Sequence, residues 1–158
     1  MTRMHVLRSV SEKQTKELGA KLADKLTKDV GKNPKPRVFL LFGDLGSGKT
    51  AFVKGFAGFL GVKRVLSPTF AIVKSYKIKR NGYTNLLHAD LYRVKNLKEL
   101  KNIGFPEILN DNKTITLIEW PELISSLSFP RLTREFRITK IYFFHGKKEN
   151  ERTIRYNS

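Results

Sequence analysis

The eight residues GDLGSGKT (43–50) constrain the fold of this chain more than any other part of its sequence. They match the pattern G-x-x-x-x-G-K-[ST], which arises by chance in a chain of 158 residues with a probability on the order of 1%. The apolar run RVFLLF precedes the motif. A helical pattern follows it from Lys49 to about Leu60, with Gly61 as its end signal. A strand before and a helix after form the context in which such a loop binds phosphate.

The residue types in this loop suit a nucleoside phosphate. Glycines let the backbone curve closely around an anion, so that successive N–H groups point inward, and the helix N-terminus adds positive potential. We expect Lys49 to bridge the β- and γ-phosphates and the Thr50 hydroxyl to ligate Mg²⁺. The expected nucleotide-binding residues here are Gly43, Asp44, Leu45, Gly46, Ser47, Gly48, Lys49, Thr50 and Ala51. A guanine-specific Asn-Lys-x-Asp motif is absent from the sequence, which favours ATP over GTP.

Two carboxylates are candidates for the chemistry of a nucleotide site. Asp90 ends the predicted strand LLHAD, and Glu119 ends the apolar strand ITLIE. Ligands of open α/β sheets bind at such strand exits, and nucleotide hydrolysis or transfer needs a carboxylate near the metal. The alternatives are a cap or turn for Asp90 and a solvated strand end for Glu119. We expect Asp90, Glu119 and Lys49 to be catalytic, and Thr50, Glu119 and Asp90 to lie at the metal.

The remaining sequence pattern predicts one α/β domain over residues 1–158. Apolar residues every four positions and an S-x-x-Q capping pattern predict an amphipathic helix over 11–30. Asn81-Gly82 predicts a hairpin that joins strands over 69–79 and 83–92. Helices near 97–103 and after Pro106, a buried strand over 113–120 and a closing hairpin of 135–144 with 151–156 complete the chain. This order predicts a single P-loop NTPase domain with a mixed, mostly central β-sheet flanked by helices.

Charge is the unusual feature of the composition. Lys and Arg number 31 against 14 Asp and Glu, which gives a formal net charge of +17. Such a balance attracts polyanions, with nucleic acid as the first candidate. The charges are nevertheless spread along the whole chain, as on an ordinary solvated surface. The sequence has no cysteine, no secretory signal and no apolar run long enough to span a bilayer, so we expect a cytoplasmic protein.

Other classes of function remain open from these residues. A small P-loop kinase of a nucleoside or metabolite also pairs this loop with a compact domain, and it should carry an arginine-rich lid. The local arginine group, at positions 131, 134 and 137, falls among predicted loop and strand. A basic RNA-binding protein whose loop merely holds nucleotide is the non-enzymatic alternative. Arg93 is the best internal candidate for a second cation over the γ-phosphate.

Four motifs together resemble the bacterial TsaE family in order and spacing: GDLGSGKT, SPTF (67–70), HADLYR (88–93) and IEWPE (118–122). The resemblance covers nearly the whole chain. It implies a protein that binds ATP and Mg²⁺ and is required to make threonylcarbamoyladenosine in tRNA. It also implies a TsaB–TsaD heterodimer as partner, whose turnover the ATPase sustains without transferring the group itself. tRNA is then an indirect partner, and the basic charge allows direct contact.

The resemblance assigns roles to individual positions of this chain. Lys49 and Thr50 match the phosphate and metal residues of the family, and Thr69 lies in a switch-like segment. Asp90 matches an aspartate that is important for hydrolysis, and Glu119 matches the glutamate on the metal side. Trp120 matches a tryptophan near the nucleotide. Core packing is the alternative role for Trp120. Many relatives carry a second threonine where this chain has Ala51, so one hydroxyl is missing there while the backbone N–H remains.

Overall fold

The computed structural model describes residues 3–28, 35–68, 71–125 and 136–157. The strands are β1 (Met4–Ser9), β2 (Arg37–Phe42), β3 (Val73–Arg80), β4 (Tyr83–Asp90), β5 (Thr114–Glu119), β6 (Arg137–His145) and β7 (Arg152–Asn157). The helices are α1 (Glu12–Thr27), α2 (Lys49–Phe59), α3 (Leu97–Asn102), α4 (Phe105–Leu109) and α5 (Glu122–Ser125). In the described part of the chain, no helix is long and apolar enough to cross a membrane.

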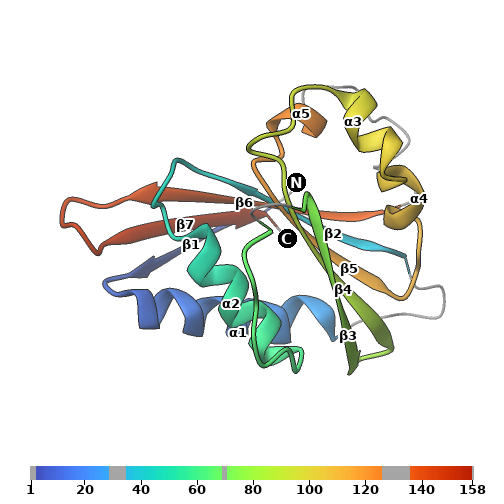
Figure 1. Cartoon of the computed structure of the whole chain (residues 1–158). Helices are drawn as coiled ribbons and strands as arrows, with labels where there is room; N and C mark the ends of the chain where they lie inside the picture. The colour runs from blue at the N-terminus through green and yellow to red at the C-terminus, as the bar shows by residue number, and fades with distance from the viewer. Residues whose placement is uncertain (1–2, 29–34, 69–70, 126–135, 158) are drawn as a thin grey trace.

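These strands form one mixed sheet in the order β1-β7-β6-β2-β5-β4-β3 (Figure 1). Its centre is parallel, because β2 pairs in parallel with both β5 and β6, and β4 pairs in parallel with β5. Antiparallel strands close both sides, with β3 beside β4 and with β7 and β1 beyond β6. The expected α/β fold with a mixed central sheet is therefore confirmed. The carboxyl ends of β2, β4 and β5 meet at one edge, where ligands of such sheets bind.

Helices α1 and α2 pack together on one face of the sheet (Figure 1). Two glycines allow their backbones to approach. A Cβ at Gly19 of α1 would lie 2.2 Å from the Phe52 carbonyl oxygen, and one at Gly55 of α2 would lie 1.9 Å from the Lys16 carbonyl oxygen. Glycine disfavours a helix by about 1 kcal/mol relative to alanine, so the packing of α2 against α1 and the sheet has to offset that cost.

The helix expected over 11–30 begins at Glu12, and Ser11 is its N-cap. The Gln14 N–H donates to Ser11 Oγ at 3.1 Å, and the Val10 N–H donates to Gln14 Oε1 at 2.9 Å. In a capping box the Gln14 side chain would accept from the N–H of the N-cap residue itself. Here it accepts from the N–H of Val10, one residue before the N-cap. The described helix ends at Thr27, and the continuation of the prediction over 29–30 lies outside the described residues.

Among the described residues, the opposite face of the sheet carries three short helices, α3, α4 and α5. Leu100, Phe105 and Leu109 are buried there against Ile118 of β5. The expected hairpin is confirmed, since Asn81 and Gly82 both have positive φ, 53° and 82°. The described helix α4 begins at Phe105, one residue before Pro106.

Two described elements were not predicted from the sequence, β1 and α5. In β1, Met4 and Val6 are exposed although they are apolar. Its side chains therefore lack the alternation of apolar inside and polar outside that identifies a half-buried strand. Helix α5 has four residues, which is too short to show a helical period.

Candidate nucleotide-binding site

The loop of residues 43–48 connects β2 to α2 at the edge where the parallel strands end. Gly48 precedes α2 as its N-cap with a φ of 101°, a conformation that side chains other than glycine rarely adopt. Gly43 is needed for space, because a Cβ there would lie 2.6 Å from Ser47 Oγ and 2.8 Å from the Phe143 carbonyl oxygen. The sequence therefore forces a tight turn that ends at the N-terminus of α2, the kind of place where backbone N–H groups bind anions.

Two residues of the closing hairpin support the loop from outside, and sequence reasoning missed both. Arg152 Nη2 donates to the Gly46 carbonyl oxygen at 2.9 Å, and His145 Nε2 lies 3.2 Å from the Leu45 carbonyl oxygen. Arg152 Nη1 also donates to the carbonyl oxygens of Glu149 and Glu151. These contacts join positions about a hundred residues apart, so no local pattern could have indicated them.

The Lys49 ammonium is buried at the start of α2 and is engaged by the loop itself. Lys49 Nζ donates to the carbonyl oxygens of Gly43 and Asp44, the latter at 2.9 Å, and lies 4.2 Å from the centre of the Trp120 ring. Burial lowers the pKa of Lys49 below its ordinary value of 10.5, and the nearby carboxylates, Glu119 foremost, oppose that shift. A buried cation beside carbonyl oxygens and carboxylates is placed to bind an anion in exchange.

The two predicted carboxylates lie side by side at the ends of adjacent strands. Asp90 of β4 is the register partner of Glu119 of β5. Glu119 is 4% exposed, and its Oε2 accepts from the Thr50 hydroxyl at 3.4 Å, whereas Asp90 Oδ1 accepts from the Tyr92 N–H at 3.0 Å. Asp90 thus forms a turn cap, as its alternative role requires, while it also faces the site. The Glu119 side chain is buried, which contradicts the alternative of a solvated strand end.

One cavity of about 510 Å³ gathers most of the predicted site residues. Its lining includes Leu45, Gly46, Ser47, Gly48, Lys49, Thr50, Ala51, Asp90, Glu119 and Trp120. Gly43 and Asp44 do not line it but hold Lys49 through their carbonyl oxygens. Lining residues that the sequence did not indicate are Glu12, Thr15, Lys54, Ser67, Asn150 and Arg152. Thr69 lies outside the described residues.

The donor set of this cavity fits Mg²⁺ held together with a nucleotide. The described residues contain no group of three His, Cys, Asp or Glu side chains that could hold a metal ion by themselves. Mg²⁺ is usually bound through one or two carboxylates, substrate phosphates and water. Thr50 and Glu119 supply such a partial set beside the phosphate loop. Ser47 Oγ is buried without a hydrogen-bond partner among the described residues, so its hydroxyl is available to bond a ligand in the cavity.

Trp120 follows β5 with a φ of 55°, which is rare for a bulky residue. Its ring lies over Lys49 and packs against Tyr92 with a centroid distance of 4.9 Å. It also contacts the core cluster under α3 and α5. The ring therefore lines the cavity on one side and packs against the core and Tyr92 on the other, so core packing describes part of its surroundings, and a position near bound nucleotide stays a prediction.

Arg93 does not line this cavity. It is exposed and lies on a neighbouring hollow that shares Leu45, Ser67 and Asp90 with the cavity at the loop. A cation there would need to turn inward to reach bound phosphates. Of the arginine group considered for a kinase lid, the residue at 137 begins β6, and the positions 131 and 134 fall outside the described residues.

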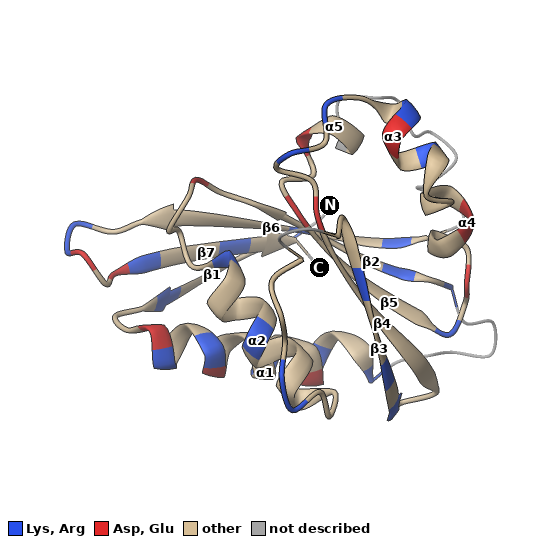
Figure 2. Ribbon diagram, in the orientation of Figure 1, with Lys and Arg blue, Asp and Glu red and all other residues tan. Residues whose placement is uncertain are grey.

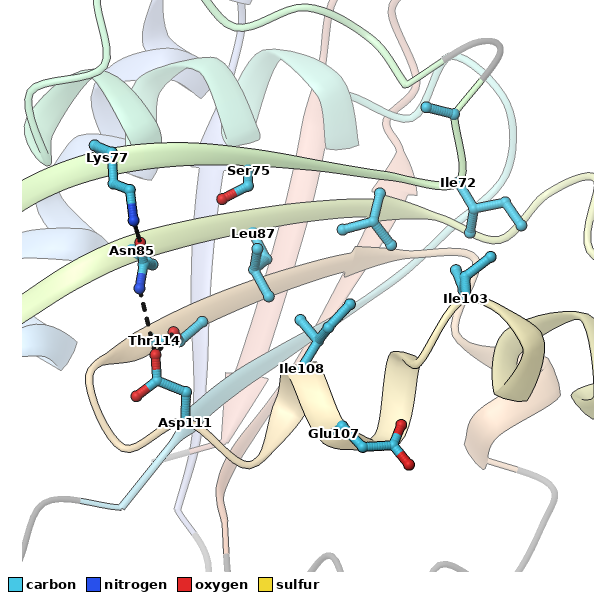
Figure 3. A pocket seen from close by; sticks show the side chains of 12 residues that line it. Ile72, Ser75, Lys77, Asn85, Leu87, Ile103, Glu107, Ile108, Asp111 and Thr114 are labelled. Atoms are coloured by element: carbon cyan, nitrogen blue, oxygen red, sulfur yellow. Dashed lines mark hydrogen bonds between the residues drawn. The ribbon is translucent and has the colours of Figure 1, made fainter.

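A third hollow, of about 740 Å³, lies between the strands β3 and β4 and the helix α4 (Figure 3). Ile72, Leu87, Ile103 and Ile108 give it an apolar floor. A polar chain closes one end, in which Lys77 Nζ donates to Asn85 Oδ1 at 2.9 Å and Asn85 Nδ2 donates to Asp111 at 3.3 Å. This groove shares no lining residue with the cavity at the loop.

Positive charge is distributed over the whole described structure. Figure 2 shows Lys and Arg on strands and helices of both faces and on the connecting turns. The distribution agrees with the spread of these residues along the sequence.

The comparisons with known proteins agree with this fold. The family model described as "Threonylcarbamoyl adenosine biosynthesis protein TsaE" matches residues 9–154. The chain is 41% identical over 134 residues to the tRNA threonylcarbamoyladenosine biosynthesis protein TsaE of Rickettsia conorii, across 82% of this chain and 67% of that protein. It is 44% identical over 94 residues to the protein of the same name from Borreliella burgdorferi, across 60% of this chain and 66% of that protein. The alignments thus span about two thirds of the length of these two relatives.

A solved structure supports the same assignment. The crystal structure of Bacillus subtilis YdiB superposes with a TM-score of 0.65 at 27% sequence identity, and the match covers 100% of this chain and 87% of that one. The chain belongs to the TsaE family, which is involved in the biosynthesis of threonylcarbamoyladenosine in tRNA.

Proposed function

We propose that this chain is a Mg²⁺-dependent ATPase required for N6-threonylcarbamoyladenosine modification of tRNA, and that it acts on a TsaB–TsaD heterodimer to sustain its turnover. The observation that carries the ATPase is the meeting of Lys49, Thr50, Asp90 and Glu119 around one cavity at the phosphate loop. The partner and the pathway rest on family membership.

Each of these side chains has a defined task in the proposal. The loop N–H groups and the N-terminus of α2 bind phosphate oxygens, and Lys49 exchanges its two loop carbonyl oxygens for them. Thr50 and Glu119 hold Mg²⁺, which when bound neutralises charge on the phosphates. Asp90, at the neighbouring strand end, orients the attacking water.

The proposal includes a partner because the described lining of the cavity offers few further cationic side chains that could stabilise charge on the γ-phosphate. Besides Lys49, the described lining contains Lys54 and Arg152. Arg152 already donates to three carbonyl oxygens, and Lys54 is exposed on the first turns of α2. An arginine placed over the γ-phosphate is worth roughly 10³- to 10⁵-fold in rate. We therefore propose slow hydrolysis by the isolated chain and faster hydrolysis in the complex.

The test is ATP turnover by the purified chain with and without its cognate TsaB–TsaD heterodimer, at concentrations where calorimetry shows that they bind. We expect the heterodimer to raise the rate of phosphate release by at least about tenfold, a small part of what a supplied arginine can give. Unchanged turnover in a demonstrated complex would refute the partner role. Accumulation of a phosphorylated small molecule in place of free phosphate would indicate a kinase.

Three variants assign the chemistry within that test. Lys49→Ala should lose most of the ATP affinity, while Lys63→Ala, an exposed lysine near the other end of α2, should retain it. Asp90→Asn and Glu119→Gln should retain binding better than turnover, because the amides keep the shape and remove only the charge. Parental rates in both amide variants would exclude these carboxylates from the reaction.

A further inference from the structure

His88 is a buried ionisable side chain to which the proposed reaction assigns no task. It lies in β4, two residues before Asp90, and is 1% exposed. In the parallel pairing of β4 with β5 its register partner is Leu117, so the side chain of Glu119, two residues further along β5, projects from the same face. His88 Nε2 lies 2.7 Å from Glu119 Oε1.

This contact divides the two oxygens of the Glu119 carboxylate between two partners. A carboxylate only accepts hydrogen bonds, so the proton of the contact belongs to His88 Nε2. With Oε1 held by the imidazole, Oε2 is the oxygen that faces the Thr50 hydroxyl at 3.4 Å. The orientation of the carboxylate toward the loop is thus fixed by a side chain that does not line the cavity.

The second ring nitrogen shows that His88 is not there for packing alone. His88 Nδ1 is buried and has no hydrogen-bond partner among the described residues. An unsatisfied buried polar atom costs free energy, and a leucine of similar volume would fill the same space without that cost. The histidine is therefore explained by what its other nitrogen does.

We propose that His88 is a positioning residue that orients Glu119, so that one defined carboxylate oxygen faces Thr50 and the metal position. The inference rests on the proposed function only for what Glu119 then does. Residues that orient ligands in this way typically matter by about 10- to 100-fold in metal affinity or activity.

The test compares His88→Leu with His88→Gln in the full-length chain. Leucine removes the donor, whereas the Gln amide nitrogen can take the place of Nε2 and donate to Glu119. The measured quantity is the Mg²⁺ concentration that gives half of the maximal affinity for a non-hydrolysable ATP analogue. We expect His88→Leu to raise it by about tenfold or more and His88→Gln to stay within about threefold of the parent.

The same measurement in a Glu119→Gln background separates positioning from a structural role. A residue that acts through Glu119 should have little further effect once that carboxylate is gone, so His88→Leu should then shift the Mg²⁺ midpoint by less than about twofold. An equal shift in both backgrounds would overturn the proposal. So would equal midpoints for the parent, His88→Leu and His88→Gln.

A measurement on the unaltered protein covers the case in which a variant fails to fold. Nitrogen-15 spectra of the imidazole ring should show a proton on Nε2 of His88. A proton on Nδ1 with a bare Nε2 would overturn the proposal, because Nε2 could not then donate to Glu119. If the parental chain bound no ATP analogue at any Mg²⁺ concentration, the proposed function would fail instead, and the ring measurement would still decide the hydrogen bond.

Discussion

The two faces of the sheet are built in different ways. On one face α1 has 16 residues and α2 has 11, and their backbones touch at two glycines. On the other face α3, α4 and α5 have six, five and four residues. The core under α1 and α2 also contains interlocking aromatic rings, with Phe52 and Phe56 packed against Phe143 and Phe39.

The phosphate loop is anchored to the face with the long helices. Its last residue is the N-cap of α2, so the direction of its N–H groups depends on how α2 is held against α1 and the sheet. The turns after β4 and β5, which carry Tyr92, Arg93 and Trp120, lie on the side of the short helices. Elements with few buried contacts open at lower free energy. We infer that the backbone of the loop is held rigidly, while the turns after β4 and β5 adjust more easily.

The largest effect should come from the close approach of α1 and α2. Gly55→Ala places a methyl group against the Lys16 carbonyl oxygen, which belongs to backbone and cannot turn aside. We expect a loss of about 5 kcal/mol in the free energy of unfolding, measured by urea denaturation, because the helices must separate.

Gly58→Ala is the matched control in the same helix. A Cβ at Gly58 meets nothing within 4 Å, so alanine should stabilise the protein by up to about 1 kcal/mol. If both substitutions changed stability in the same direction, the close approach would not be the reason for Gly55.

This pair of glycines shows what the sequence could and could not predict about the fold. Several glycines in a helix after a phosphate loop already indicated that packing stabilises it. Which glycine touches another backbone depends on the position of α1, and no pattern within α2 contains that information. The hairpin turn was predictable because Asn-Gly favours positive φ locally, whereas β1 was missed because its exposed Met4 and Val6 hide the alternation.

The candidate site divides in the same way. Lys49 and Thr50 were predictable from a continuous motif, and Asp90 and Glu119 from their places at strand ends. That Asp90 is the register partner of Glu119 follows from the pairing of β4 with β5, which single-strand patterns do not specify. Arg152 and His145 reach the loop from the last hairpin, and only the folded sheet brings them there.

The next largest loss of stability is expected when equally buried leucines on the two faces are replaced by alanine. Leu22 of α1 and Leu100 of α3 are both 3% exposed. We expect Leu22→Ala to cost about 4 kcal/mol and Leu100→Ala about 2 kcal/mol in the free energy of unfolding, because the short helix can collapse into the cavity and the long one cannot. Equal losses in thermal or urea unfolding would mean that the two faces are equally rigid.

Each side of the sheet also has an ionisable residue whose pKa is shifted, Lys49 at the loop and Asp111 at the groove. We expect the larger effect from Lys49. Burial lowers its pKa below 10.5, and bound phosphate would raise it again. Between those two pKa values, nucleotide binding should take up a proton, and affinity should fall by up to about tenfold per pH unit as the pH rises. Calorimetry in two buffers of different ionisation enthalpy should detect proton uptake that increases as the pH is raised toward 10.5. Proton uptake that did not increase with pH would contradict the shift.

Asp111, at the rim of the groove on the other side, should give the smallest effect. The Thr114 hydroxyl, the Lys113 N–H and Asn85 donate to its carboxylate and lower its pKa below 3.8. A carboxylate with a lowered folded pKa stabilises the protein above its unfolded pKa and loses that contribution as the pH falls through the folded pKa.

Because the side chain is exposed, Asp111→Asn should reduce the free energy of unfolding by less than about 1 kcal/mol at pH 7. The difference from the parent should shrink below about pH 4. Urea unfolding of both proteins at pH 7 and pH 3 measures it, and a difference that grew on acidification would show that the carboxylate is not stabilised in its charged form.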